Sequence, residues 1–145
     1  MKSKILEVKN YHAELQANSV DTTTDVTQSV MSEAGEYGFV VFKLDANRKQ
    51  KPHFHTYGDI DIFMIVEGSG ILHLAEVKDD QVVSGSKEAL PLKQGDIYSV
   101  KPYFLHSIET KDEPIVIANI APLAHSDLKE GRKNQIAIDL FFTKS

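Results

Sequence analysis

The sequence contains no cysteine and no tryptophan, and it has no long run of apolar residues. Without cysteine, disulfide bonds and thiolate zinc sites are excluded, so any metal must be held by nitrogen and oxygen. No stretch approaches the length of a membrane-spanning helix, and the first residues lack the apolar core of a signal peptide. We therefore expect a soluble, cytoplasmic protein that makes no contact with a membrane.

Positive charge is also scarce. The chain has 16 Lys and Arg against 21 Asp and Glu, which gives a formal net charge of −5. The basic residues are scattered, apart from short groups within residues 48–51 and 132–133. Nucleic acids and anionic membranes select continuous basic patches, so this distribution argues against both as the main partner.

The size and composition are those of one globular domain. The chain has 145 residues, of which 41% are hydrophobic and 26% are charged. A chain of this length closes one core but is too short for two. We therefore treat residues 1–145 as a single domain.

In the middle of the chain, apolar and polar residues alternate with a period of two, and turn-forming residues are frequent. The pattern predicts strands at residues 37–44, 61–67, 71–77, 89–92, 97–100, 106–108 and 114–120. Two of these, 61–67 and 114–120, are apolar on both faces, as expected for strands buried inside a closed sheet. We expect a tight turn at residues 68–70 and hairpin turns at residues 79–80 and 95–96. Many short strands with such turns indicate an all-β sandwich or barrel.

The two ends differ from this middle part. Residues 10–35 show little apolar period and are expected to form an irregular arm with one edge strand. Near the other end, Ser126 is placed to cap a short helical turn that Gly131 ends. Residues 136–142 are predicted to be a terminal strand, so apolar that it should pair with the barrel edge or with a second subunit.

The strongest chemical signal is a pair of histidines two residues apart. On a strand, His53 and His55 project to the same face with their α-carbons about 6–7 Å apart, while Phe54 faces the other way. Two carboxylates, Asp59 and Asp61, follow, and His106 comes after the turn at residues 95–96. Such a set of three imidazoles and one carboxylate is typical of sites for Fe, Mn, Ni, Zn or Cu. The isolated histidines 12, 73 and 125 are better interpreted as ordinary polar residues.

These residues resemble the two motifs of the cupin family, whose fold is a double-stranded β-helix (a jelly-roll barrel). The first motif, G-x5-H-x-H-x3-4-E-x6-G, is read here as Asn47, His53, His55, Asp61 and Gly68. The second, G-x5-P-x-G-x2-H-x3-N, is read as Gly95, Pro102 and His106.

The chain departs from these motifs at four positions. Asn47 replaces a glycine, which is tolerable because asparagine visits the left-handed region. Asp61 replaces the glutamate. Tyr103 stands at a glycine position, so the turn before His106 is expected to differ, and Thr110 replaces the final asparagine, which should affect structure more than chemistry.

The resemblance implies a barrel core over about residues 36–122, an N-terminal arm over 1–35 and a C-terminal tail over 123–145. It also implies that His53, His55, Asp61 and His106 bind one divalent metal, with Asp59 as the competing carboxylate. Each ligating histidine should donate its other N–H to an acceptor.

The function implied by the resemblance is that of a metal-dependent enzyme, a dioxygenase or an isomerase, acting on a small oxygenated molecule. The alternative is a non-catalytic barrel that binds or senses a small molecule. A homodimer is expected in either case. Four residues are candidate acids or bases: Glu67, Glu109, Tyr98 and Tyr103. Six aromatic residues are candidates to line the pocket, with ordinary core packing as the competing interpretation: Phe54, Tyr57, Phe63, Tyr98, Tyr103 and Phe104.

Overall fold

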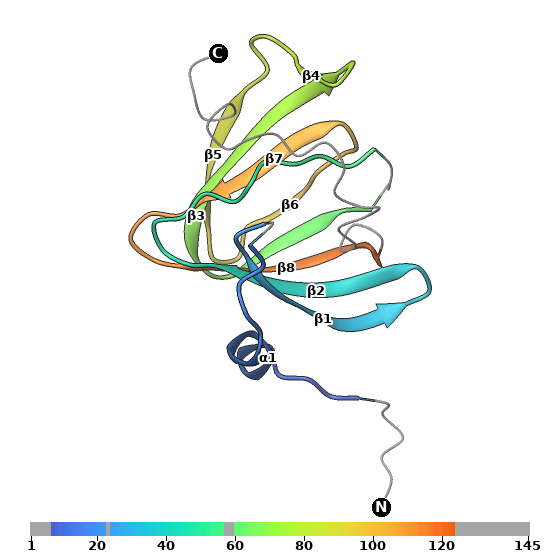
Figure 1. Ribbon diagram of the computed structural model, residues 1–145, viewed down its shortest axis with the longest axis vertical. Coiled ribbons are helices and arrows are strands. Elements are labelled where there is room, and N and C mark those ends of the chain that lie inside the picture. Colours follow the sequence, from blue (N-terminus) through green and yellow to red (C-terminus); the bar gives the residue numbers. More distant parts are fainter. Residues whose placement is uncertain (1–6, 23, 57–59, 124–145) are drawn as a thin grey trace, which may run out of the picture.

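The computed structural model describes residues 7–22, 24–56 and 60–123. Antiparallel strands dominate this part of the chain, with a single short helix near its start (Figure 1). The elements are α1 (Tyr11–Ala17), β1 (Thr27–Ala34), β2 (Tyr37–Leu44), β3 (Ile62–Lys78), β4 (Gln81–Val82), β5 (Glu88–Lys93), β6 (Ile97–Ser99), β7 (Phe104–Glu109) and β8 (Ile115–Pro122). The all-β class expected from the sequence is confirmed. No helix in the described part has the length and apolar character needed to span a membrane.

The long strand β3 organises the sheet. Its first part pairs with β8 and β6, and β8 leads on to β2 and β1. Its second part pairs with β5, β7 and β4. The sheet therefore folds over at β3, and the two parts face each other across an apolar core (Figure 1). Within the described residues the hydrogen bonding does not close into a complete barrel, so the expected closed sheet is wrong in that respect.

The tight turn predicted at residues 68–70 is also wrong, because β3 runs through it as one strand. Gly68 has a φ of +80°, next to a register shift between Ile65 and Glu67 in the pairing with β8. A Cβ at this position would lie 2.0 Å from the carbonyl oxygen of Pro114. The glycine therefore lets β3 bend and pass close to β8, instead of reversing the chain.

The two strands predicted to be buried on both faces differ from each other. In β8 the first four residues are all buried, as expected. In β3, Phe63 and Ile65 are buried, but Ile62 and Met64 are 39% and 41% exposed. The reason is that the other face of this part of the sheet is only partly covered.

Helix α1 covers part of this outer face of the sheet. The sequence pattern did not predict this helix. Its N-cap is Asn10, whose side chain accepts a hydrogen bond from the Ala13 N–H. Tyr11 and Leu15 of α1 pack on a buried cluster formed by Val41, Val116 and Ala118. The expected edge strand in this region is confirmed as β1, which pairs only with β2 among the described residues. The helical turn after Ser126 and the strand at residues 136–142 lie outside the described residues.

Candidate metal centre

Backbone pairing brings the two histidine motifs together. His53 lies between β2 and β3, and it forms an antiparallel bridge with His106 on β7. The His53 N–H donates to the His106 carbonyl at 3.2 Å, and the His106 N–H donates back at 2.9 Å. The Tyr103 N–H donates to the His55 carbonyl at 2.8 Å. Three backbone hydrogen bonds therefore fix the spacing of the three imidazoles.

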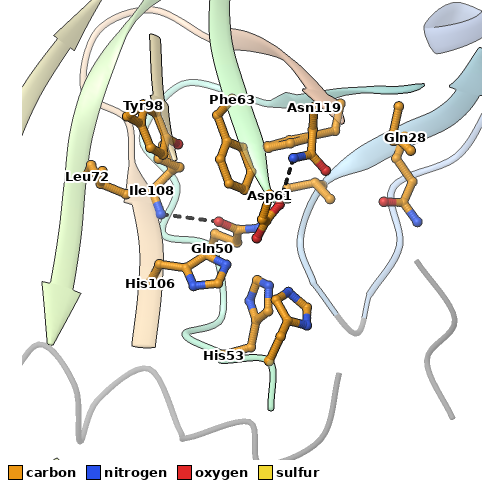
Figure 2. Close-up of a pocket in the computed structure, with 14 residues that line it drawn as sticks. Gln28, Gln50, His53, Asp61, Phe63, Leu72, Tyr98, His106, Ile108 and Asn119 are labelled. Atoms are coloured by element: carbon orange, nitrogen blue, oxygen red, sulfur yellow. Dashed lines mark hydrogen bonds between the residues drawn. The ribbon is translucent and has the colours of Figure 1, made fainter. Parts of the chain in front are cut away.

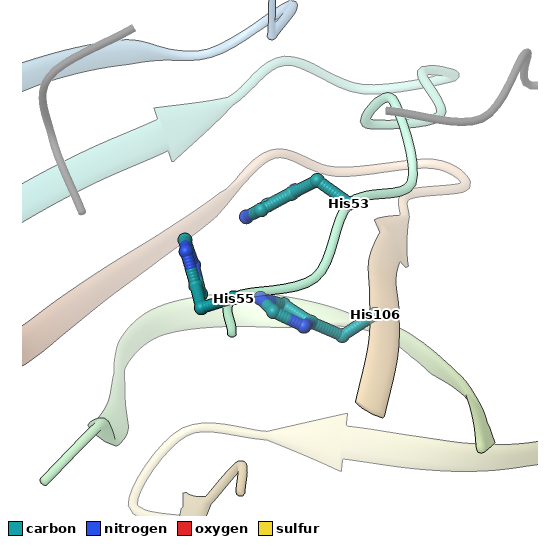
Figure 3. A group of neighbouring side chains, drawn as sticks. All are labelled: His53, His55 and His106. Carbon is teal, nitrogen blue, oxygen red and sulfur yellow. The ribbon is translucent and has the colours of Figure 1, made fainter. Parts of the chain in front are cut away.

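The alternation predicted at His53–Phe54–His55 is confirmed. Phe54 is 1% exposed and packs in a separate apolar cluster with Ala75, Val77 and Leu105. His53 and His55 instead face the space where His106 also points (Figure 3). Phe54 thus anchors the segment that presents the two histidines.

The three imidazoles form a compact buried group. One ring nitrogen from each of His53, His55 and His106 can be chosen so that all three lie within 4.8 Å of one another. The ring centroids are 4.3 Å apart for His53 and His106, 5.0 Å for His53 and His55, and 5.5 Å for His55 and His106. All three residues are buried, between 5% and 8% exposed. A donor set of three nitrogens at this separation fits one divalent transition metal.

Two of the histidines have the second contact expected of metal ligands. The Nδ1 of His106 lies 2.9 Å from the Phe104 carbonyl oxygen, and the Nδ1 of His53 lies 3.3 Å from that of Lys51. A carbonyl oxygen only accepts hydrogen bonds, so each Nδ1 carries a proton and donates. This tautomer puts the lone pair that a metal requires on Nε2.

Asp61 lies in the same cavity but outside the compact group of three histidines. It is 4% exposed, and its Oδ1 accepts a hydrogen bond of 2.9 Å from the Asn119 amide (Figure 2). Burial raises the pKa of Asp61 from 3.8 to about 7, although the hydrogen bond from Asn119 opposes this shift. Its role as the fourth ligand stays a prediction. The competing residue, Asp59, lies outside the described residues.

The cavity around the histidines is small, and both polar and apolar side chains line it. Its volume is about 40 Å³. Besides the histidines and Asp61, its walls are formed by Val26, Gln28, Val40, Phe42, Gln50, Phe63, Leu72, Tyr98, Ile108 and Asn119 (Figure 2). The three carboxamides were not predicted from the sequence, because they come from three segments that only the folded sheet brings together. The one available signal was that Asn119 interrupts an apolar strand.

Gln50 is fixed from two sides. Its side-chain Oε1 accepts a hydrogen bond of 3.2 Å from the Ile108 N–H, and its backbone carbonyl accepts one from the Ser107 hydroxyl. With Oε1 used in this way, the amide NH₂ group lies on the side of Asp61 (Figure 2). A fixed donor next to a carboxylate is a suitable contact for a polar ligand.

The other candidates from the sequence are divided between cavity, core and surface. Phe63 and Tyr98 line the cavity and stack on each other, with ring centroids 4.8 Å apart. Phe104 packs against the core, and Tyr103 is 48% exposed. Tyr57 lies outside the described residues.

Two of the candidate acids and bases are in contact with other residues. Glu67 interacts with Tyr11 of α1, and Glu109 pairs with His73 at 3.0 Å. Neither lines the cavity. Tyr98 is therefore the one proposed acid or base, of the four, that lies at this site.

The departures from the family motifs have structural explanations. Asn47 takes a φ of +56°, as expected of a residue that replaces glycine. Tyr103 takes a φ of +65°, so the turn before His106 keeps a conformation that favours glycine, although we expected a different turn. Thr110 is 2% exposed; its hydroxyl donates to the Asp45 carbonyl and accepts from the Arg48 N–H at 3.0 Å. Thr110 directly follows β7, so its role is structural: it joins the end of β7 to the turn after β2.

No protein-family model and no curated protein matches the sequence. The structure, in contrast, is similar to solved structures. A cupin-2 domain protein of Rhodospirillum rubrum has a TM-score of 0.55 and 13% identity, over 69% of this chain and 61% of that chain. A predicted oxalate decarboxylase of Thermotoga maritima has a TM-score of 0.51 and 20% identity, over 68% and 80%.

The polyketide cyclase RemF of Streptomyces resistomycificus has a TM-score of 0.54 and 14% identity, over 84% of this chain and 80% of that chain. Sequence identities this low indicate a shared fold but do not indicate a shared activity. Together with the strand topology and the two histidine motifs, these likenesses identify the chain as a protein of the cupin fold, the double-stranded β-helix.

Proposed function

We propose that this protein is a metal-dependent enzyme, of the dioxygenase or isomerase class, that acts on a small oxygenated molecule. The observation that carries the proposal is the convergence of three buried imidazoles, two of them with Nδ1 hydrogen-bonded to a backbone carbonyl. Burying three imidazole rings costs free energy that hydrogen bonds or a bound cation must offset, and the convergence of one nitrogen from each ring fits a single shared cation.

His53, His55 and His106 would hold the metal, with Asp61 as a fourth ligand. When bound, a divalent Fe, Mn, Ni, Zn or Cu ion supplies Lewis acidity, and a redox-active one also supplies electron transfer. The remaining roles belong to the chain's own side chains.

Asn119 orients Asp61, because its amide donates to both the carboxylate and the Ile62 carbonyl and so cannot turn away. Gln50, whose Oε1 is held by the Ile108 N–H, would donate its amide hydrogens to a substrate oxygen, and Tyr98 lines the same cavity with a hydroxyl group that can also donate. Phe63, Leu72 and Ile108 belong to the apolar part of the wall, which would limit access of water. These features favour a small molecule that carries hydroxyl or carbonyl oxygens.

The fold also supports an enzyme, since the solved structures similar to this chain include a polyketide cyclase and a predicted oxalate decarboxylase. The alternative is a cupin that binds or senses a small molecule without converting it. The same site would serve both roles, so only a measurement of turnover separates them.

The test uses untagged protein, because a histidine tag would bind metal itself. The metal content of the purified chain is measured beside a His53→Ala/His106→Ala variant and a His73→Ala control, whose histidine pairs with Glu109 away from the cavity. We expect about one equivalent of metal in the wild type and the control, and little in the double variant. The loaded protein is then assayed for oxygen consumption and for isomerisation with small hydroxy-carbonyl compounds. Metal without turnover supports the sensing alternative. No metal after reconstitution contradicts the metal-dependent enzyme and leaves a non-catalytic binding protein.

A further inference from the structure

Within the part of the chain that the structure describes, one face of the sheet carries a group of large apolar side chains that no element covers. Phe39, Ile62, Met64, Ile97 and Ile120 are between 39% and 66% exposed, and we name them the outer apolar patch. Single exposed apolar residues are common on protein surfaces, but a contiguous group indicates that something covers it.

The strand register shows that the patch is contiguous. Phe39 on β2 pairs with Ile120 on β8, and Ile120 pairs in turn with Ile62 on β3. Met64 lies two residues after Ile62, hence on the same face, and it pairs with Ile97 on β6. The patch therefore crosses four neighbouring strands.

The opposite face of the same strands lines the metal cavity. Val40, Asn119, Phe63 and Tyr98 are each one residue away from a patch residue, and all four line the cavity. The patch thus points away from the candidate metal centre. An inference about what covers the patch is therefore independent of the proposed function.

The neighbouring part of the outer face already has a cover. The side chains of Val41, Val116 and Ala118 are buried under α1, with Tyr11 and Leu15 in contact. Ala118 pairs with Met64, so the covered area continues directly into the patch. Since α1 ends at Ala17, it leaves the second half of the face exposed (Figure 1).

The described chain ends beside the patch. Leu123 follows Ile120 by three residues, and its N–H donates to the Glu36 carbonyl at 2.8 Å. The apolar residues 136–142 follow after twelve further residues. Twelve residues span up to about 40 Å when extended, which is ample for a return over the same face.

We propose that residues 136–142 of the same chain dock on the outer apolar patch and complete the cover that α1 begins. A second copy is the competing occupant, but a stable interface between two proteins takes about 20–30 residues per partner, and the patch offers five. A tethered segment also docks without the entropy loss of joining two molecules, because the linker keeps its local concentration high.

Cysteine cross-linking tests the docking directly, because the native chain has no cysteine. Met64→Cys is combined in turn with Ile136→Cys, Ile138→Cys and Leu140→Cys, and disulfide formation is followed in dilute, oxidising solution. The control combines the same tail positions with Leu90→Cys, which is 44% exposed on β5. We expect an intramolecular disulfide with position 64 that forms about tenfold faster, or more, than with position 90. Equal rates at the two positions, or a disulfide that joins two chains, would overturn the proposal.

Hydrogen exchange, measured on protein without added cysteines, provides a second test of the docking. The amides of residues 136–142 should exchange slowly in the wild type and in Leu90→Asp, and rapidly in Ile97→Asp, which places a charge in the patch. Ile97 is the most exposed patch residue, so this change leaves the core intact. Metal binding and far-ultraviolet circular dichroism verify that the variant is folded. Rapid exchange in the folded wild type would contradict the docking.

Discussion

At the scale of single residues, the site combines a compact set of imidazole nitrogen donors with a buried carboxyl group. No lysine or arginine lines the described cavity, so neither residue type compensates the charge of Asp61 there. Asn119 provides only a neutral hydrogen bond. A buried carboxylate with so little compensation destabilises the metal-free fold, as expected of a group whose charge is matched by a bound cation.

The buried carboxyl group of Asp61 predicts how the stability of the metal-free protein depends on pH. The pKa of Asp61 is about 7 in the folded state, raised from 3.8, so the folded chain holds a proton that the unfolded chain has lost. Stability should therefore fall as the pH rises from about 4 to about 7, by on the order of 2–4 kcal/mol. Asp61→Asn keeps the hydrogen bond from Asn119 and removes the charge.

Urea unfolding in the presence of a chelator tests this prediction. The stability advantage of Asp61→Asn over the wild type should widen between pH 5 and pH 8. Asp80→Asn, an exposed change in the turn between β3 and β4, serves as the control and should show no such trend. An advantage of equal size at both pH values would show that the buried charge is not the cause.

A second prediction concerns Thr110, which stands at the asparagine position of the family motif. Thr110→Val keeps the shape but removes the hydroxyl that bonds to Asp45 and Arg48, and leaves both backbone groups short of a partner. We expect a loss of about 1–3 kcal/mol in the free energy of unfolding. Thr110→Ser retains the hydroxyl and should lose less. Denaturant unfolding of both variants measures the difference, and equal losses would mean that the methyl group, not the hydroxyl, is what matters.

The residues with chemical character could be predicted from the sequence, but their surroundings could not. The spacing of His53 and His55 fixes which face they share, because strand alternation is local. Gln50 and Asn119 reach the site only through pairings between distant segments, which no local pattern encodes. The carboxylate ligand stayed open for the same reason, since the path of the chain between His55 and β3 decides it.

At the scale of elements, the bend in β3 decides the architecture. The sequence pattern predicted β2 with its observed bounds, because a short run rich in Val, Phe and Tyr lies between turn residues. The same rules misread residues 68–70, because two glycines in three residues are typical of a turn. Here Gly68 is required because the Pro114 carbonyl lies close to it, and not because the chain turns. A local sequence pattern does not reveal such a contact between distant segments.

Gly68→Ala should therefore be strongly destabilising, by about 2 kcal/mol or more, because a Cβ would meet the Pro114 carbonyl in a conformation already unfavourable for alanine. Gly85→Ala is the matched control. Gly85 has a similar φ of +78°, but a Cβ there would meet nothing within 4 Å. Thermal unfolding should show a clearly lower midpoint for Gly68→Ala than for Gly85→Ala. Equal midpoints would mean that the positive φ alone, and not the contact with β8, requires the glycine.

At the scale of the whole molecule, the inner and outer faces of the folded sheet have separate roles. The inner face holds the histidines and the cavity, and the outer face is covered by α1 and, in our proposal, by residues 136–142. The homodimer and the cytoplasmic location expected from the sequence stay predictions. If the tail covers its own chain, its apolar character no longer requires a second copy.

Metal binding should stabilise the folded chain, because the unfolded chain lacks the assembled site. Saturation at about 100 times the dissociation constant corresponds to about 2.7 kcal/mol. We expect the unfolding midpoint of the wild type to rise when Fe, Mn, Ni, Zn or Cu is added, and that of His55→Ala to remain unchanged. His12→Ala, a change on the surface helix α1, should respond like the wild type. A similar rise in His55→Ala would mean that the metal binds elsewhere.

The most direct test of the central claim is anomalous diffraction from crystals of the untagged, metal-loaded protein, recorded at the absorption edge of the bound metal. Our account predicts one peak about 2.0–2.2 Å from the Nε2 atoms of His53 and His106 and from one ring nitrogen of His55. The distance from the peak to Asp61 then shows whether this residue is the fourth ligand. A fully loaded crystal with no peak between the three histidines would contradict the account.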